Sequence, residues 1–183
     1  IDPNPELDNI LVKAFFSAAN RAMMVKSGAE VIQLFSESFR VHQDIAHAIE
    51  ATKKANSNAD SDTKLDLEMI IRKWYPGLSL EHEYRGFVNN GTLNALSQYY
   101  HFCYFPHMVP LKDKIAEKIK TYWKEHIKDV VPMQSYVVDF CFVPQNLNAR
   151  PHVEDIHAFD IKVIELNPFH YGTGACHFGW KKG

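Results

Sequence analysis

Cysteine is scarce in this 183-residue chain: it has three, Cys103, Cys141 and Cys176, and none belongs to a CxxC pair. An odd number without paired spacing predicts reduced thiols in a reducing compartment rather than a disulfide framework. No apolar run approaches the ~20 residues that span a bilayer, and no signal segment opens the sequence. We therefore expect no membrane partner and a cytoplasmic location. The first residue is Ile1 rather than Met, which suggests a piece excised from a longer protein.

A strong charge of one sign is also missing. Twenty Lys and Arg residues stand against 22 Asp and Glu residues, a formal net charge of -2, so we expect no nucleic-acid partner. The chain lacks GxxxxGK[ST] and GxGxxG, which excludes the common P-loop and Rossmann phosphate sites. A nucleotide ligand stays compatible with this balance, because one lysine and one arginine suffice for its phosphates.

The remaining pattern mixes helical and strand signals, which predicts an α+β fold in one domain over residues 1–183. The polar, alanine-containing segment 52–64 reads as a mobile loop. Asn90-Gly91 predicts a tight hairpin turn between residues 81–88 and 92–98. The other elements expected from apolar spacing are short strands over 10–16 and 23–26, a helix or broken helix pair over 29–52 that starts at Ser27-Gly28, renewed apolar character over 67–74, an amphipathic helix over 111–126, and apolar strands over 135–143 and 161–169.

The last two strands carry the sharpest chemical pattern. Glu165 and Asn167 are two residues apart, so both side chains leave the same face of a strand. Asp139 is the one carboxylate in the other apolar strand. If the two strands pair, two carboxylates and an amide oxygen converge, and Mg²⁺ prefers such hard oxygen donors. The alternative is that these are edge-exposed polar residues or turn caps.

Three basic residues stand inside apolar segments and raise a second question. Lys13 in ILVKAFF must either extend its ammonium group to solvent or meet an anion such as a phosphate. Arg72 and Arg85 lie in two further apolar strands, and arginine suits phosphates because it donates paired hydrogen bonds. Either arginine can instead pair with a carboxylate, Glu81, Glu83 or Asp139. A zinc site at His101, Cys103 and His107 is disfavoured, because the spacing matches no established zinc pattern.

Two longer runs resemble a known family. IIRKWYPGLSLEHEYRGFVNNGTLNALSQ and VIELNPFHYGTGACHFGW are similar to the motifs of the cell division cycle protein 123 family, in the same order and from about Lys13 to Trp180. The resemblance implies an ATP-grasp-like fold, with antiparallel sheets, packed helices and a nucleotide between two lobes. It also implies a role in assembling a translation initiation factor, with ATP, Mg²⁺ and a factor subunit as partners.

By the same resemblance, Asp139, Glu165 and Asn167 match the magnesium ligands, and Lys13 matches a phosphate-binding lysine on a strand. The implied nucleotide contacts are Lys13, Ile71, Arg72 and Trp74, the last three at the hinge, and Arg85. The chain departs from the family at Glu165, where aspartate is usual, and at Tyr99, where arginine is usual. Two functions stay open: a nucleotide-dependent assembly factor, and an ATP-grasp ligase that joins a carboxylate to an amine through an acyl phosphate. Whether the chain is an enzyme stays open too.

Overall fold

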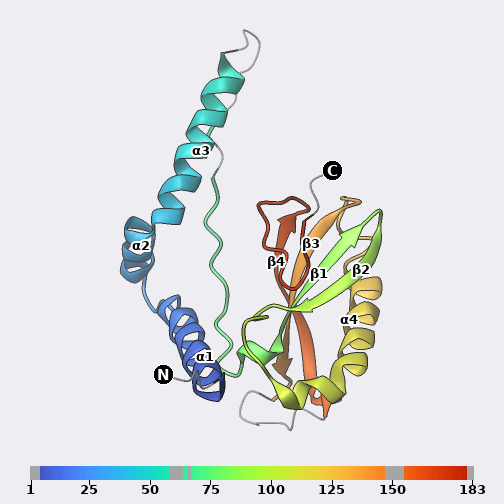
Figure 1. Cartoon of the computed structure of the whole chain (residues 1–183). Coiled ribbons are helices and arrows are strands. Elements are labelled where there is room, and N and C mark those ends of the chain that lie inside the picture. The colour runs from blue at the N-terminus through green and yellow to red at the C-terminus, as the bar shows by residue number, and fades with distance from the viewer. Residues whose placement is uncertain (1–4, 58–63, 66, 147–154, 181–183) are drawn as a thin grey trace. The chain divides into compact units, whose positions relative to one another are not determined.

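The computed structural model describes residues 5–57, 64–65, 67–146 and 155–180. The chain divides into two compact units, residues 1–17 with 75–183 and residues 18–74, and each is described by itself. The predicted α+β class is confirmed, because the described residues combine α-helices with an antiparallel four-stranded sheet (Figure 1). The extent of a single domain over residues 1–183 stays a prediction.

The sheet belongs to the first unit and has the strand order β2-β1-β3-β4. Its strands are β1 (Glu83–Asn89), β2 (Thr92–Gln98), β3 (Tyr136–Pro144) and β4 (Phe159–Pro168), and all neighbours pair antiparallel. Every residue of β3 is buried, because this strand has a neighbour on each edge and is covered on both faces. The two apolar strands predicted over 135–143 and 161–169 are thereby confirmed, with β4 beginning two residues earlier.

The predicted hairpin is confirmed as β1 and β2. Asn90 has φ 51° and Gly91 has φ 66°, the pair of positive dihedrals that a tight two-residue hairpin turn requires. Glycine adopts such a dihedral without steric cost, and asparagine tolerates it better than most residues. The Gly91 N–H also donates to the Gln134 carbonyl at 2.8 Å, which ties the turn to the segment before β3.

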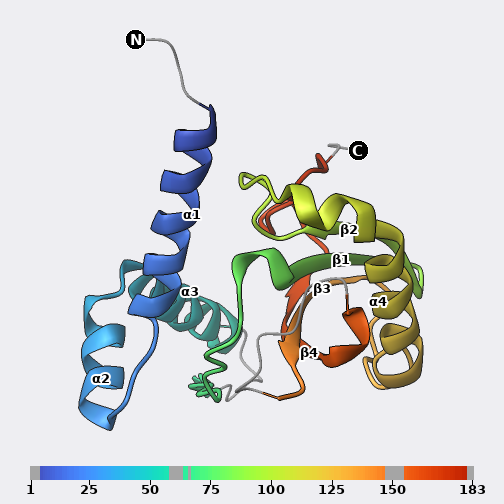
Figure 2. The same cartoon turned by 90° about the horizontal axis from the view of Figure 1, so that it is seen from below.

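One face of the sheet packs on helix α4 (Lys112–His126) (Figure 2). Its buried residues Ile115, Ile119 and Trp123 repeat every four positions, as the sequence predicted for an amphipathic helix. The Trp123 indole N–H donates to the Tyr136 hydroxyl at 2.9 Å, so the one polar atom of this buried ring is satisfied. The opposite face of the sheet carries the polar residues described below.

Residues 10–16 form part of helix α1 (Pro5–Ala22), so the strand predicted there is wrong. The apolar run is short, and its flanks decide the structure: proline is favoured at the first helical position. Acidic residues occupy the first turn and Arg21 the last, which matches the helix dipole. Within the first unit, Phe16 packs on Tyr100 with ring centroids 5.2 Å apart.

The second unit contains the broken helix pair that the sequence allowed, α2 (Gly28–Glu37) and α3 (Phe39–Asn56). Ser27 caps α2, because its hydroxyl accepts from the Glu30 N–H at 3.2 Å. Ser38 ends α2 and begins α3, since its hydroxyl accepts from the Val41 N–H at 3.4 Å. The break therefore comes from a serine that favours a cap over a helix interior.

Three further expectations for the second unit need correction or lie outside the description. Residues 23–26 form a turn and irregular backbone rather than a strand, and residues 67–74 have no regular secondary structure. Helix α3 continues through Asn56, so the beginning of the loop expected over 52–64 is helical. Residues 58–63 of that loop lie outside the described residues.

Gly86 supplies a test of the packing between β1 and β3. A Cβ at this position would lie 2.9 Å from Leu93 Cδ1 and 2.9 Å from Phe140 Cε2, and Phe140 is fully buried. Gly86→Ala should therefore lower the free energy of unfolding in urea by about 1–3 kcal/mol, the usual cost of overpacking. Gly179→Ala is the matched control, because a Cβ there meets nothing within 4 Å. Equal stability of the two variants would contradict this packing.

Candidate functional site

A buried ion pair lies at the centre of the sheet face opposite α4. Arg85 on β1 and Asp139 on β3 are register partners. Arg85 Nε donates to Asp139 Oδ1 at 2.7 Å, and Nη2 donates to Oδ2 at 2.7 Å. The two side chains are 7% and 1% exposed. The carboxylate alternative left open for Arg85 is therefore present, in the paired geometry that arginine favours.

Glu165 and Asn167 on β4 complete the cluster beside this pair. Asp139 and Glu165 are register partners, next to a bulge that shifts the pairing between Asp139 and Phe140. Asn167 Nδ2 donates to Asp139 Oδ2 at 3.3 Å and to Glu165 Oε1 at 3.0 Å. The convergence of Asp139, Glu165 and Asn167 predicted from strand alternation is thus observed, while their role as metal ligands stays a prediction.

Glu83 also belongs to this neighbourhood, although the sequence analysis named it only as an alternative carboxylate partner for an arginine. It lies two residues before Arg85 on β1, on the same face, and is buried. Its position at the start of a strand gave no signal of its own, because Glu81 and Glu83 flank His82 in a short polar stretch. Only the register of β1 on β3 brings Glu83 near the predicted carboxylates.

Burial and mutual repulsion change the acidity of these groups. Burial raises the pKa of Glu83 to about 7, and the charges of Asp139 and Glu165 add to the shift. Burial also raises the pKa of Asp139 to about 6, although the hydrogen bonds from Arg85 act in the opposite direction. The Arg85 pKa is raised: burial alone would lower it, and the bonds to Asp139 outweigh that effect. Asp139 is therefore bonded to the Arg85 guanidinium and Glu165 approaches it at 3.8 Å, while Glu83 adds a third acidic group to the neighbourhood.

The C-terminal segment and Tyr99, the residue that follows β2, contact the Arg85 side of the cluster. Arg85 Nη1 donates to the Gly174 carbonyl at 2.7 Å, so the guanidinium also holds the segment that follows β4. The Tyr99 ring lies over the same guanidinium, with Cζ 4.9 Å from the ring centroid. At position 99 the family that the chain resembles usually has arginine, whereas in this chain the aromatic ring of Tyr99 lies over the Arg85 guanidinium. Trp180 Nε1 donates to the Thr173 carbonyl at 2.6 Å, which folds the segment back on itself.

The other predicted nucleotide contacts do not belong to the strands of the sheet. Lys13 stands on helix α1, not on a strand, and belongs to the same unit as the sheet rather than to a separate lobe. Its Nζ lies 4.4 Å from the centroid of the Phe105 ring. Ile71, Arg72 and Trp74 belong to the second unit, in an irregular segment, and are exposed. Their roles in nucleotide binding stay predictions.

The side-chain oxygens of Asp139, Glu165 and Asn167 are the kind of ligand that a hard divalent cation prefers. Among the described residues no three His, Cys, Asp or Glu side chains form a metal-binding group. A cation here would need the amide oxygen of Asn167 as a third ligand, with the amide turned from the arrangement in which its nitrogen faces the two carboxylates. Each carboxylate oxygen offers two acceptor positions. Arg85 takes one on each oxygen of Asp139 and Asn167 takes the second on Oδ2, so one position on Oδ1 remains. The Glu165 side chain is 49% exposed, which leaves the cluster open to phosphate and water oxygens on that side.

Comparison with known proteins identifies the family. The D123 family model matches residues 13–182. The chain belongs to the D123 family. This confirms the resemblance to the cell division cycle protein 123 family. No helix in the described part of this D123 chain is both long and apolar enough to cross a membrane.

Curated relatives and a solved structure agree with this assignment. The chain is 25% identical over 163 residues to a "Translation initiation factor eIF2 assembly protein" of Vanderwaltozyma polyspora, covering 89% of this chain and 40% of the relative. It is 26% identical over 170 residues to the protein of that name in Xenopus tropicalis, covering 91% and 44%. The fold matches Cdc123 from Schizosaccharomyces pombe with a TM-score of 0.59 and 22% identity, over 85% of this chain and 55% of that one. The chain thus spans less than half the length of these curated relatives.

The raised pKa of Glu83 predicts a pH dependence of stability. A carboxyl whose folded pKa of about 7 exceeds its ordinary value of 4.5 stabilises the fold below pH 4.5, and this contribution is lost as the pH rises to about 7. Glu83→Gln should remove that part of the slope, at most about 1.4 kcal/mol per pH unit for one proton. Urea unfolding at steps of half a pH unit measures this slope. Glu117→Gln, at an exposed carboxyl, is the control, and an unchanged slope in Glu83→Gln would contradict the assignment.

Proposed function

We propose that this chain is the ATP- and Mg²⁺-binding part of a protein that assembles a translation initiation factor. The observation that carries the proposal is the cluster of Arg85, Asp139, Glu165 and Asn167 on one sheet face. Family membership supports it, because relatives in the family carry the name eIF2 assembly protein. A subunit of eIF2 is the corresponding partner of this chain.

Asp139, Glu165 and Asn167 would hold the cation, which would neutralise phosphate charge when bound. Without a cation the cluster disfavours ATP, because Glu83, Asp139 and Glu165 outnumber the single guanidinium of Arg85. Like charges repel strongly where water is excluded. The dependence of ATP binding on a divalent cation follows from this excess of acidic groups.

Arg85 keeps donors for a phosphate. A guanidinium has five N–H groups, and the bonds to Asp139 and Gly174 use three of them. The remaining donors belong to Nη1 and Nη2, which carry two hydrogens each. Arg85 would therefore orient a phosphate oxygen while it keeps Asp139 in place. Lys13, Ile71, Arg72 and Trp74 remain proposed nucleotide contacts on the family resemblance alone.

The proposed fold context is the ATP-grasp arrangement, in which a nucleotide lies between two lobes. The sheet with its acidic cluster would be one wall of that arrangement. The antiparallel sheet and its likeness in fold to a Cdc123 structure support this reading. The output would be a protein complex rather than a new amide bond.

Calorimetry on the full chain tests the cation site. ATP with Mg²⁺ should bind, and ATP with a chelator should bind much more weakly. Glu165→Gln and Asn167→Ala should each weaken Mg²⁺-dependent ATP binding by about 1–3 kcal/mol, the cost of losing a contact to a charged group. Glu117→Gln is the control: it removes an exposed carboxyl outside the cluster and should leave the affinity for ATP unchanged. Equal ATP affinity with and without Mg²⁺ would contradict the metal assignment.

A capture experiment separates the assembly factor from the ligase. The immobilised full chain should retain an eIF2 subunit, and more of it with Mg²⁺ and ATP than without. Steady ADP release that depends on an added amine and carboxylic acid would support an ATP-grasp ligase instead.

A further inference from the structure

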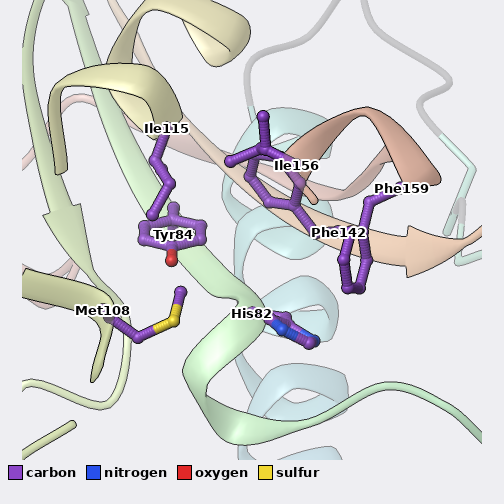
Figure 3. A pocket seen from close by; sticks show the side chains of 7 residues that line it. All are labelled: His82, Tyr84, Met108, Ile115, Phe142, Ile156 and Phe159. Carbon is purple, nitrogen blue, oxygen red and sulfur yellow. The ribbon is translucent and has the colours of Figure 1, made fainter. Parts of the chain in front are cut away.

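A histidine at the other end of the sheet lacks partners for its ring. His82 is 8% exposed, and neither ring nitrogen has a hydrogen-bond partner among the residues that the structure describes. Its ring instead packs against Phe159, with centroids 4.9 Å apart at an angle of 64° (Figure 3). A buried polar group without a partner costs about 1–3 kcal/mol, so this position calls for an explanation.

The ring lies at a small, almost wholly apolar cavity. The cavity measures about 10 Å³, which is close to the space that one water molecule needs. A dry or nearly dry cavity cannot solvate a charge, so the environment favours the neutral imidazole. The residues that line it are His82, Tyr84, Met108, Ile115, Phe142, Ile156 and Phe159 (Figure 3).

Phe159 is the first residue of β4 and follows the short 3-10 helix Ile156–Ala158. Lys118 on α4 fastens this point, because its Nζ donates to the carbonyls of Ile156 and Phe159 at 2.6 Å each. The start of β4 is thus held by an ammonium group through its backbone and by a neutral imidazole through its side chain. Glu165 and Asn167 lie further along the same strand.

The charges around His82 do not form a ready partner for an imidazolium. Glu81 favours the charged ring, and His107 opposes it; these two side chains face each other at 3.8 Å. Lys118 adds positive charge on the α4 side. Other titratable groups on the elements packed against the ring include Glu83 and Tyr84 on β1 and Asp155, His157 and Asp160 around the start of β4. Burial is the largest effect and lowers the pKa of His82.

We propose that His82 is an acid-sensitive latch: the neutral ring holds Phe159 at the start of β4, and protonation of the ring releases it. The charged ring would have to leave its apolar site to reach water, and its contact with Phe159 would be lost. The direction follows from linkage, because a folded pKa below the unfolded value of 6.5 stabilises the fold above pH 6.5. That stabilisation is lost as the pH falls through the lowered value.

Hydrogen exchange on the full chain tests the latch at the place where it acts. As the pH falls from 6.5 toward that of the folded transition, the opening equilibrium for amides of residues 156–161 should increase by up to about tenfold per pH unit, the limit for one proton, and it should level off below that transition. The rates are corrected for intrinsic exchange. Amides of the β1–β2 turn are the internal reference and should not follow this dependence. NMR titration of the His82 ring gives the pH at which the ring is protonated in the folded chain, for comparison with the pH dependence of exchange.

Two substitutions keep the proposal open to refutation. His82→Phe retains an aromatic ring against Phe159, and His82→Leu is a smaller apolar choice if the first does not fold. Both should abolish the acid-induced opening, while His126→Gln, at an exposed histidine, should retain it. Acid-induced opening that persists in both His82 variants would overturn the proposal. The opposite pH dependence of Glu83 is present in all of these proteins and therefore cancels in the comparison.

Discussion

The buried pair of Arg85 and Asp139 is the interaction on which this face of the sheet depends. It joins β1 and β3 through two hydrogen bonds of 2.7 Å each, and the same guanidinium donates a third hydrogen bond to the Gly174 carbonyl. Removing one member of such a pair leaves a buried charge uncompensated and typically costs about 3–5 kcal/mol, whereas replacing both by apolar residues is often neutral. The pair therefore adds little net stability. Its effect is to fix where the second carboxylate and the amide of β4 can lie.

That constraint also sets the chemistry of the site. The guanidinium satisfies Asp139 and leaves Glu165 half exposed, so one carboxylate is positioned and the other remains open to a ligand. The buried acid Glu83 adds further negative potential to the same region. In the proposed function, a cation would relieve this excess and create a place for phosphates, which the acidic face would otherwise repel. The name eIF2 assembly protein, which relatives of this chain carry, is compatible with such a nucleotide-dependent step.

The sequence predicted the site better than it predicted the N-terminal half. Strand alternation placed Glu165 and Asn167 on one face, and Asn90-Gly91 set the hairpin, because both depend on local geometry. Residues 10–16 were predicted wrongly as a strand, since a seven-residue apolar run fits either element and its helical flanks decide. The place of Glu83 beside Asp139 and Glu165 could not be predicted, because it depends on the pairing of β1 with β3, in which Glu83 and its register partner Cys141 are 58 residues apart in sequence. The apolar surroundings of His82 could not be predicted either, because four separate parts of the chain contribute the residues that line its cavity.

Paramagnetic mapping of the divalent cation tests the central claim most directly. Mn²⁺ prefers the same oxygen ligands as Mg²⁺ and broadens NMR signals of nearby nuclei. With ATP and substoichiometric Mn²⁺, the full chain should lose signals around Asp139, Glu165 and Asn167 first, and excess Mg²⁺ should restore them. Broadening that spares these residues, or that spreads equally over exposed carboxylates such as Glu117, would contradict a cation site at this end of β3 and β4.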